Sequence, residues 1–204
     1  MKPAFFNIAE IKRETIIKAC ISEFGEYGYE KSSTDRIIRL ANISKGGLYE
    51  YISSKEELFL YITEFVFQGL YSFIRNKLEG RQNIPEDILE RFRIVSEIAI
   101  DFYIANPSYI KFIVNTGRLN DPSLEKKVKT IFAKQFNSVF GNLSEKNLRY
   151  DKAKIIEMLI WLLAKTRDDF LHAMEQSNNT KRLKKIYLEN WDFYLSILKT
   201  GIYS

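Results

Sequence analysis

The sequence predicts an all-α protein, because residues that interrupt helices are rare in it and apolar side chains recur at helical spacing. Its 204 residues include 9 glycines and 4 prolines. A proline is tolerated in a first helical turn, where the N–H that it lacks would have no partner. No alternating run is long enough to predict a strand. Each proline stands where a helix is expected to begin, namely at Pro3, Pro85, Pro107 and Pro122.

Capping residues and breaks in the apolar pattern give the expected helix boundaries. Gly28 is expected to end the first helix as a C′ residue. Ser32, with Asp35 three positions later, suggests a capping box for the second helix, and Ser44 is expected to cap the third. About nine helices are predicted, over residues 5–27, about 33–41, 44–51, 53–78, 86–105, 108–118, 122–140, 151–176 and 181–202.

Charge and cysteine content narrow the function without deciding it. The net charge of +5 and a pI near 9.1 permit a nucleic-acid partner. Residues 1–60 are neutral, with nine basic and nine acidic side chains, although five basic residues over 31–55 face only two acidic ones. Cys20 is the only cysteine, which excludes an intrachain disulfide and suits a reducing cytoplasm.

No enzyme class is indicated by the residue types present. The sequence has one histidine and one cysteine, too few for a multi-histidine metal site and enough for a single Cys–His pair at most. We therefore expect no catalytic residue, metal or cofactor. The first ten residues are too short and polar for a signal peptide, and no apolar run of about 18 residues predicts a membrane span. A cytoplasmic protein is expected.

Residues 28–58 carry the most specific pattern. Two short helices joined by a tight turn, after a longer helix, are the layout of a helix-turn-helix domain. The segment reads GYEKSSTDRIIRLANISKGGLYEYISSKEEL, which resembles the signature of the TetR family of bacterial transcriptional regulators over about residues 10–60. The resemblance implies a DNA-binding domain over residues 1–53 and a helical ligand-binding and dimerisation domain over residues 54–204.

The residues expected at the DNA stand at helix starts and on the second short helix. Hydroxyls and free N–H groups at helix N-termini meet phosphate oxygens, and Lys45 can reach a phosphate or a guanine edge. Gly46 and Gly47 each lower helix stability by about 1 kcal/mol relative to Ala. Their presence is explained if the absence of side chains lets the helix backbone approach DNA closely. The expected DNA-binding residues are Ser33, Thr34, Ser44, Lys45, Gly46, Gly47, Tyr49, Glu50, Tyr51 and Lys55.

Several positions depart from the family pattern. Asn42 replaces the turn glycine, and asparagine tolerates the left-handed conformation that such a turn needs. Glu50 either accepts from a cytosine amino group or points into solvent. These departures affect which operator sequence is bound more than binding itself. The small core that fixes the angle between the two helices is expected to consist of Ile37, Ile43 and Leu48.

Beyond about residue 60, the resemblance implies an effector site and a dimer interface. A cavity among the many aromatic side chains would suit an apolar or aromatic ligand, although core packing explains most of them. The final two helices are expected to pair with their symmetry mates, and Trp161 and Trp191 belong either to that interface or to the pocket. The candidate ligand-binding residues are Phe102, Tyr103, Phe112, Asn115, Thr116, Arg118, Trp161, Asp168 and His172.

Two functions remain open. The first is a homodimeric repressor that binds near-palindromic double-stranded DNA in the bacterial nucleoid. A small effector would release it by acting through the helix that starts near Lys55. The second is a regulator of the same fold that a protein partner controls, without a small-molecule pocket. An apolar cavity in the carboxy-terminal part favours the first, and a fully packed core favours the second.

Overall fold

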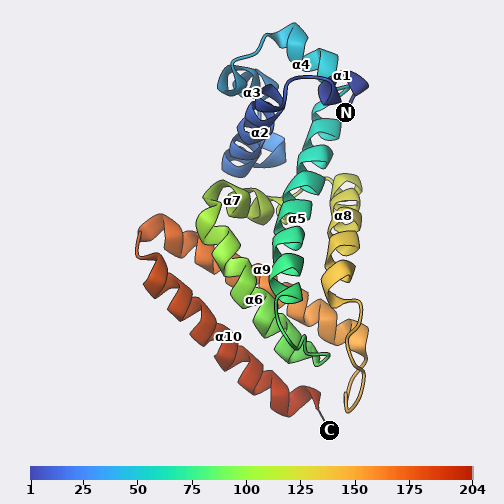
Figure 1. Cartoon of the computed structure of the whole chain (residues 1–204), viewed down its shortest axis with the longest axis vertical. Helices are drawn as coiled ribbons and strands as arrows, with labels where there is room; N and C mark the ends of the chain where they lie inside the picture. Colours follow the sequence, from blue (N-terminus) through green and yellow to red (C-terminus); the bar gives the residue numbers. More distant parts are fainter. Residues whose placement is uncertain (204) are drawn as a thin grey trace. The chain divides into compact units, whose positions relative to one another are not determined.

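The polypeptide forms ten α-helices in a computed structural model that describes residues 1–203 (Figure 1). No named strand occurs within that range, where one isolated bridge pairs Leu148 with Tyr203. The prediction of an all-α protein is therefore confirmed. The helices are α1 (Pro3–Phe6), α2 (Glu10–Lys31), α3 (Thr34–Ala41), α4 (Lys45–Tyr51), α5 (Lys55–Glu79), α6 (Ile88–Ala105), α7 (Pro107–Thr116), α8 (Pro122–Phe140), α9 (Lys152–Gln176) and α10 (Thr180–Ile202).

The one helix more than the predicted nine comes from the amino terminus. Residues 7–9 are not helical, so the single first helix that was expected is divided into the four-residue α1 and the long α2. Gly28 has φ +68° and kinks α2, as its predicted role at a helix end requires. A last helical turn follows the kink and ends at Lys31.

The short helices are capped largely as the sequence predicts. The Ser44 hydroxyl accepts from the Gly47 N–H at 3.0 Å, and Asn42 adopts the left-handed conformation with φ +50°. The predicted capping box at Ser32 is wrong, because Ser33 is the residue that precedes α3. The Ser32 hydroxyl instead donates to the Tyr29 carbonyl at 2.7 Å, closing the end of α2.

The helices pack into two compact units. Unit 1 consists of Met1–Gly69 and Pro107–Gln135, and unit 2 of Leu70–Asn106 and residues 136–203. Both α5 and α8 contribute residues to each unit. Unit 1 thus adds the first part of α5, all of α7 and most of α8 to the predicted DNA-binding residues 1–53.

In unit 1 the core forms where α2 meets α7. A Cβ added at Gly25 would lie 3.2 Å from the Phe112 backbone nitrogen and 3.2 Å from the Ser108 carbonyl oxygen, so a glycine permits this approach. The Phe24 and Phe59 rings are 5.1 Å apart, and the Phe59 and Phe112 rings 5.6 Å apart. These contacts pack the carboxy-terminal half of α2 against α5 and α7.

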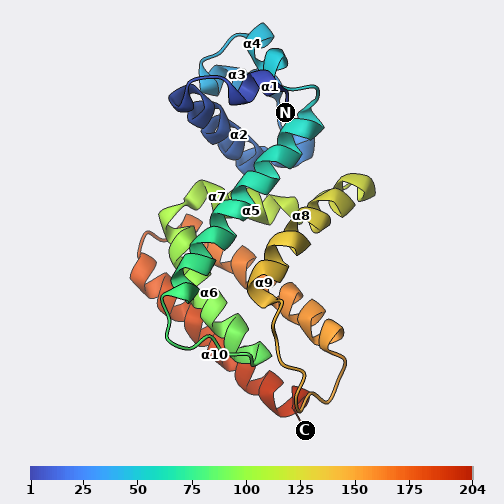
Figure 2. The same ribbon diagram turned by 45° about the vertical axis from the view of Figure 1, so that its right-hand side comes forward.

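In unit 2 the core forms between α6, α9 and α10, and α10 runs along α6 in both views (Figures 1 and 2). Ion pairs join Arg93 to Asp192 and Lys184 to Asp101, which sets the two helices antiparallel. No helix among residues 1–203 is long and apolar enough to cross a membrane.

Candidate nucleic-acid interface

The turn between α3 and α4 is built by backbone hydrogen bonds. The Asn42 N–H donates to the Arg39 carbonyl at 3.2 Å, and the Ile43 N–H donates to the Ile38 carbonyl at 3.1 Å. Beneath the turn, Ile37 and Leu48 are fully buried, as predicted for the core between the two helices. The third predicted core residue, Ile43, is half-buried.

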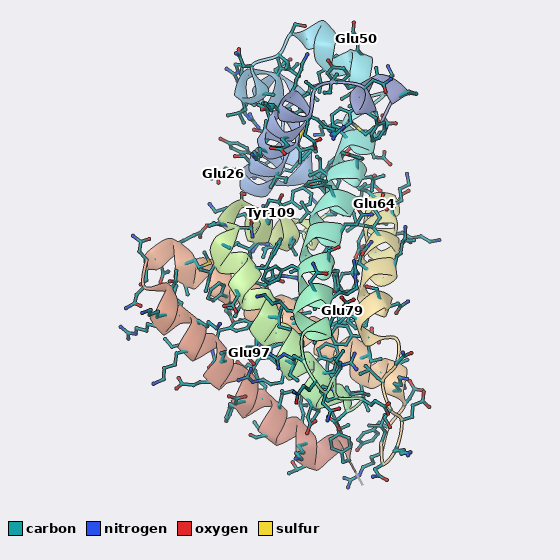
Figure 3. The ribbon with its side chains drawn as sticks, viewed as in Figure 1. Glu26, Glu50, Glu64, Glu79, Glu97 and Tyr109 are labelled. Carbon is teal, nitrogen blue, oxygen red and sulfur yellow. The ribbon has the colours of Figure 1, made fainter. Side chains whose placement is uncertain are left out.

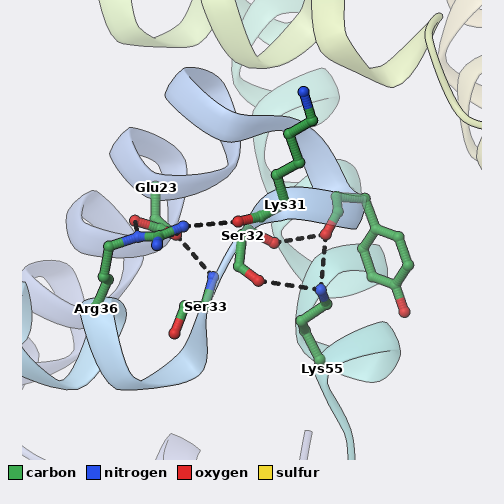
Figure 4. A network of polar contacts seen from close by, with 7 residues as sticks. Glu23, Lys31, Ser32, Ser33, Arg36 and Lys55 are labelled. Atoms are coloured by element: carbon green, nitrogen blue, oxygen red, sulfur yellow. Dashed lines mark hydrogen bonds and ion pairs between the residues drawn. The ribbon is translucent and has the colours of Figure 1, made fainter.

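A buried carboxylate ties α2 to the start of α3 (Figure 4). Glu23 is 1% exposed, and its carboxylate accepts from the Ser33 backbone N–H at 2.7 Å and from Arg36 Nε at 2.8 Å. Arg36 also donates from Nη2 to the Lys31 carbonyl at 2.7 Å and stacks over the Tyr27 ring at 4.1 Å. Since charge-assisted bonds of this kind are stronger than neutral ones, the angle between α2 and α3 is held at both ends of the loop.

Lys55 holds the other side of the same loop (Figure 4). Its Nζ donates to the Tyr29 carbonyl at 2.7 Å and to the Ser32 carbonyl at 3.2 Å, and it lies 4.5 Å above the Tyr29 ring. Burial lowers the pKa of Lys55 below its usual value. Lys55 was predicted to bind a phosphate, but its ammonium uses two of its three N–H donors on carbonyls at the end of α2. Its main role in this structure is therefore structural.

The exposed surface of α3 and α4 carries most of the residues predicted to bind DNA. Thr34 Oγ1 lies 3.4 Å from the Tyr49 hydroxyl, which brings the start of α3 next to α4. Glu50 projects from α4 (Figure 3). Lys45 is largely exposed and lies 3.3 Å from a carboxylate oxygen of Asp35. Ser33, Thr34 and Gly47 are half-buried, whereas Ser44, Lys45, Gly46, Tyr49 and Glu50 are exposed.

Tyr51 does not fit its predicted role as a phosphate ligand. Its side chain is 4% exposed and packs edge-on against the Phe5 ring, with centroids 6.0 Å apart. Helix α1 brings this phenylalanine to α4, and the Lys2 ammonium donates to the Tyr49 carbonyl at 2.8 Å. The sequence pattern of the motif gave no sign that residues 1–6 cover α4, because the contact joins segments more than 40 positions apart.

The nine candidate ligand residues are divided between the two units. In unit 1, the Asn115 amide donates to the Gly25 carbonyl at 2.8 Å and the Thr116 hydroxyl to the Ile113 carbonyl at 2.6 Å, so both have structural partners. Phe112 is core there, and Arg118 is exposed. Unit 2 holds the other five, of which Phe102 and Tyr103 are buried, Asp168 is half-buried, and Trp161 and His172 are exposed.

Groups that could support catalysis are isolated. Burial raises the pKa of the Cys20 thiol well above its usual range, so the thiolate nucleophile is suppressed. Within residues 1–203, no three His, Cys, Asp or Glu side chains gather in a way that could hold a metal ion.

Replacing Glu23 by alanine tests the anchor between α2 and α3. We expect the free energy of unfolding to fall by about 1–3 kcal/mol, because a buried N–H and a guanidinium lose their acceptor. Glu26→Ala is the matched control on the same helix, since Glu26 makes an exposed ion pair with Lys111 at 3.2 Å, worth about 0–1 kcal/mol. Urea denaturation measures both, and equal losses would contradict a special role for Glu23.

Comparisons with known proteins identify the same region. A family model described as bacterial regulatory proteins, tetR family, matches residues 16–62, which run from α2 into α5. A search of curated protein sequences gives no match. Among solved structures, a TetR family transcriptional regulator from Chloroflexus aurantiacus has a TM-score of 0.74 at 19% identity, covering 100% of this chain and 98% of that chain.

Two further solved structures share the fold at low identity. The transcriptional regulator FadR from Bacillus subtilis, in complex with stearoyl-CoA, has a TM-score of 0.67 at 16% identity, covering 87% of this chain and 96% of its own. The fatty acid degradation regulator FadR from Bacillus halodurans has a TM-score of 0.64 at 15% identity, with 86% and 97% covered. The family model thus matches the helix-turn-helix segment, and the chain shares its fold with these TetR family regulators.

Proposed function

We propose that this regulator is a homodimeric repressor that binds a near-palindromic operator through α3 and α4 and leaves it when a small effector occupies unit 2. The observation that carries the proposal is the short, exposed α4, whose capped first turn presents Lys45 and Gly46 on a rigidly anchored frame. Such a helix fits the major groove, and free N–H groups at its start suit a phosphate. The protein would act in the cytoplasm, at the nucleoid.

The amino-terminal segment adds to this interface. The Lys2 ammonium lies against the carboxy-terminal half of α4, where it donates to the Tyr49 carbonyl. Thr34, the first residue of α3, has its hydroxyl beside that of Tyr49. Hydroxyls and ammonium groups at these places are typical backbone contacts, which position a reading helix without selecting a sequence. Base selection is then left to Lys45, Tyr49 and Glu50 on the exposed side of α4.

Exposed apolar side chains on the last two helices support a dimer. Those on α9 are spaced by three positions and those on α10 by seven and four, so each set follows one helix face. Contiguous exposed aromatic and aliphatic groups mark interaction sites, and aromatic residues often dominate their binding energy. The set consists of Met158 and Trp161 on α9 and of Ile186, Phe193 and Ile197 on α10, with exposures of 36–67%. We therefore assign Trp161 to the interface.

The link between effector and DNA would run along α5. Residues of α5 belong to both compact units, and Lys55 in its first turn holds the end of α2. An effector that prefers one position of α5 would shift the population of that arrangement, and with it the spacing of the two α4 helices in a dimer. A relative of the same fold holds stearoyl-CoA, which supports a ligand with an apolar body.

Lys45→Ala is expected to weaken binding to operator DNA and to reduce the slope of log affinity against log salt by about 1, because one phosphate or base contact is lost. Lys18→Ala, which removes an equally exposed ammonium from α2, is the control and should leave affinity and slope unchanged. Fluorescence anisotropy at several salt concentrations measures both. Equal behaviour of the two variants would remove Lys45 from the interface.

Gly46→Ala separates DNA contact from helix stability. A Cβ at Gly46 meets nothing within 4 Å in the free protein, so the variant should gain up to about 1 kcal/mol in unfolding free energy from helix propensity. If the backbone of α4 approaches DNA here, the same variant should bind operator more weakly. Thermal unfolding and anisotropy together test this, and a variant that is more stable and binds as well as wild type would refute the close approach.

Phe193→Glu is expected to convert the dimer to a monomer, since it puts a charge into the apolar stripe. Sedimentation equilibrium gives the mass, and Ile84→Glu, at an exposed apolar position between α5 and α6, should stay dimeric. The dimer through α9 and α10 is excluded if the Phe193 variant keeps the dimer mass.

A further inference from the structure

Unit 2 contains buried polar atoms that have no hydrogen-bond partner. They are Ser96 Oγ on α6, Arg167 Nε on α9, and Tyr187 OH and Trp191 Nε1 on α10. Ser96 and Trp191 are 0% exposed, and Tyr187 is 4% exposed. Since an unpaired buried donor costs about 1–3 kcal/mol, four such atoms in one unit call for a physical explanation.

These four atoms come from one level of the helix packing. The ion pairs Arg93–Asp192 and Lys184–Asp101 fix the antiparallel register of α6 and α10. In that register Ser96 lies level with the stretch of α10 between Tyr187 and Trp191, which are four apart and share a helix face. From α9, Phe170 packs edge-on against the Tyr187 ring, with centroids 5.5 Å apart.

The remaining groups lie close to the Tyr187 hydroxyl. Burial raises the pKa of Tyr187 to about 12, and Tyr103 adds to the rise. Polar contacts with Trp191 and Thr166, which do not reach hydrogen-bond geometry, and the charge of Arg167 oppose it. Burial likewise raises the pKa of Tyr71, again with Tyr103 adding to it and Arg167 opposing it. The Tyr187 hydroxyl therefore stays protonated at neutral pH and can donate.

The chemistry of this set favours an oxygen anion. An indole N–H and a guanidinium N–H only donate, and the tyrosine and serine hydroxyls can donate as well. Arg167 supplies a positive charge, and none of the four residues carries an acidic group. Asp169 lines the adjoining pocket, but it is exposed and forms an ion pair with Lys165. A carboxylate or phosphate would satisfy several donors at once and would be held by charge-assisted bonds.

A largely apolar pocket shares Tyr187 with this set of donors. It has a volume of about 150 Å³ and is lined by apolar side chains, among them Phe170, Leu183 and Ile186, and by the polar Thr166, Asp169 and Asn190. A cavity of about this size in an apolar core holds a benzene molecule. The pocket thus offers space for an arene or a short acyl chain next to the donor group.

We propose that unit 2 binds a small apolar oxyanion, with its charged oxygens on Arg167, Tyr187, Trp191 and Ser96 and its arene or short acyl chain in the adjoining pocket. The inference deepens the proposed effector site and depends on it. It names the charge of the ligand, its size and the residues that select it. It also places the site among α6, α9 and α10, and leaves the unit 1 candidates Phe112, Asn115, Thr116 and Arg118 to structural roles.

Binding is measured by fluorescence and calorimetry on the full chain. In a Trp161→Phe background, emission reports on Trp191 alone, since the chain has 2 tryptophans. Benzoate, hexanoate and phenyl phosphate are the anionic probes, and benzamide and benzyl alcohol the neutral ones. We expect at least one anion to change the emission of Trp191 and to bind ten-fold or more tightly than the neutral probes. The pattern among the anions distinguishes a carboxylate from a phosphate ligand.

Two variants separate binding from folding. Arg167→Met should weaken the anion that binds by ten-fold or more while leaving neutral probes unchanged, and circular dichroism checks its fold. Tyr187→Phe removes one unpaired hydroxyl, so without ligand its melting temperature should stay level or rise, whereas a structural hydroxyl would lower it. Tyr194→Phe on the same helix is the control and should bind as wild type does.

The proposal is overturned if the neutral probes bind as tightly as the anions, or if none of the three anions binds at millimolar concentration, in which case the donors are solvated by water. Anisotropy on operator DNA, run in parallel, keeps the two proposals apart. A protein that binds operator and is released by a neutral compound would retain the proposed function and lose this site.

Discussion

The helix-turn-helix depends on one buried carboxylate. Glu23 sits on the apolar side of α2, and taking its charge out of water is unfavourable unless the charge is paired and hydrogen-bonded. The Ser33 N–H and the Arg36 guanidinium supply those bonds, and both can do so only when α3 stands at one angle to α2. Lys55 fixes the opposite side of the loop. The orientation of α4, and so of the residues that we propose to face DNA, follows from these bonds.

The rigidity of that frame explains how α4 tolerates two glycines. A helix of seven residues with Gly46 and Gly47 would not form alone, because short helices are marginal and each glycine weakens them further. Here the Ser44 cap, the buried Leu48 and the cover provided by Phe5 over Tyr51 hold it in place. Tertiary contacts supply the stability that the helix lacks locally, and Gly46 keeps the exposed first turn free of a side chain.

Local features of the sequence predicted local structure well. The left-handed Asn42, the Ser44 cap, the break at Gly28 and nearly all helices follow from backbone and capping chemistry within a few residues. The roles of Tyr51 and Lys55 did not follow, because each is decided by a partner distant in sequence: Phe5 covers the tyrosine, and two carbonyls at the end of α2 hold the lysine. Glu23 was missed because one acid in an apolar pattern has no local signature.

Ligand-binding residues are harder to predict from sequence than helix boundaries. Aromatic and polar groups on apolar stretches are equally typical of a core and of a pocket, and only the packing shows which donors lack partners. Of the nine candidates, Tyr103 lies beside the unpaired donors of unit 2, whereas Asn115 and Thr116 already have partners in unit 1. The α9 and α10 pair combines an exposed apolar stripe with a buried polar set, which suits helices that both join two protomers and hold a ligand.

The central claim is that two copies of this anchored α4 read a symmetric DNA site. Selection of sequences from a random pool of double-stranded DNA by the purified full-length protein tests it most directly. The account predicts an enriched, two-fold symmetric sequence whose half-sites lie about one helical turn, or a multiple of it, apart. Enrichment of no sequence, or of a single half-site without symmetry, would contradict it.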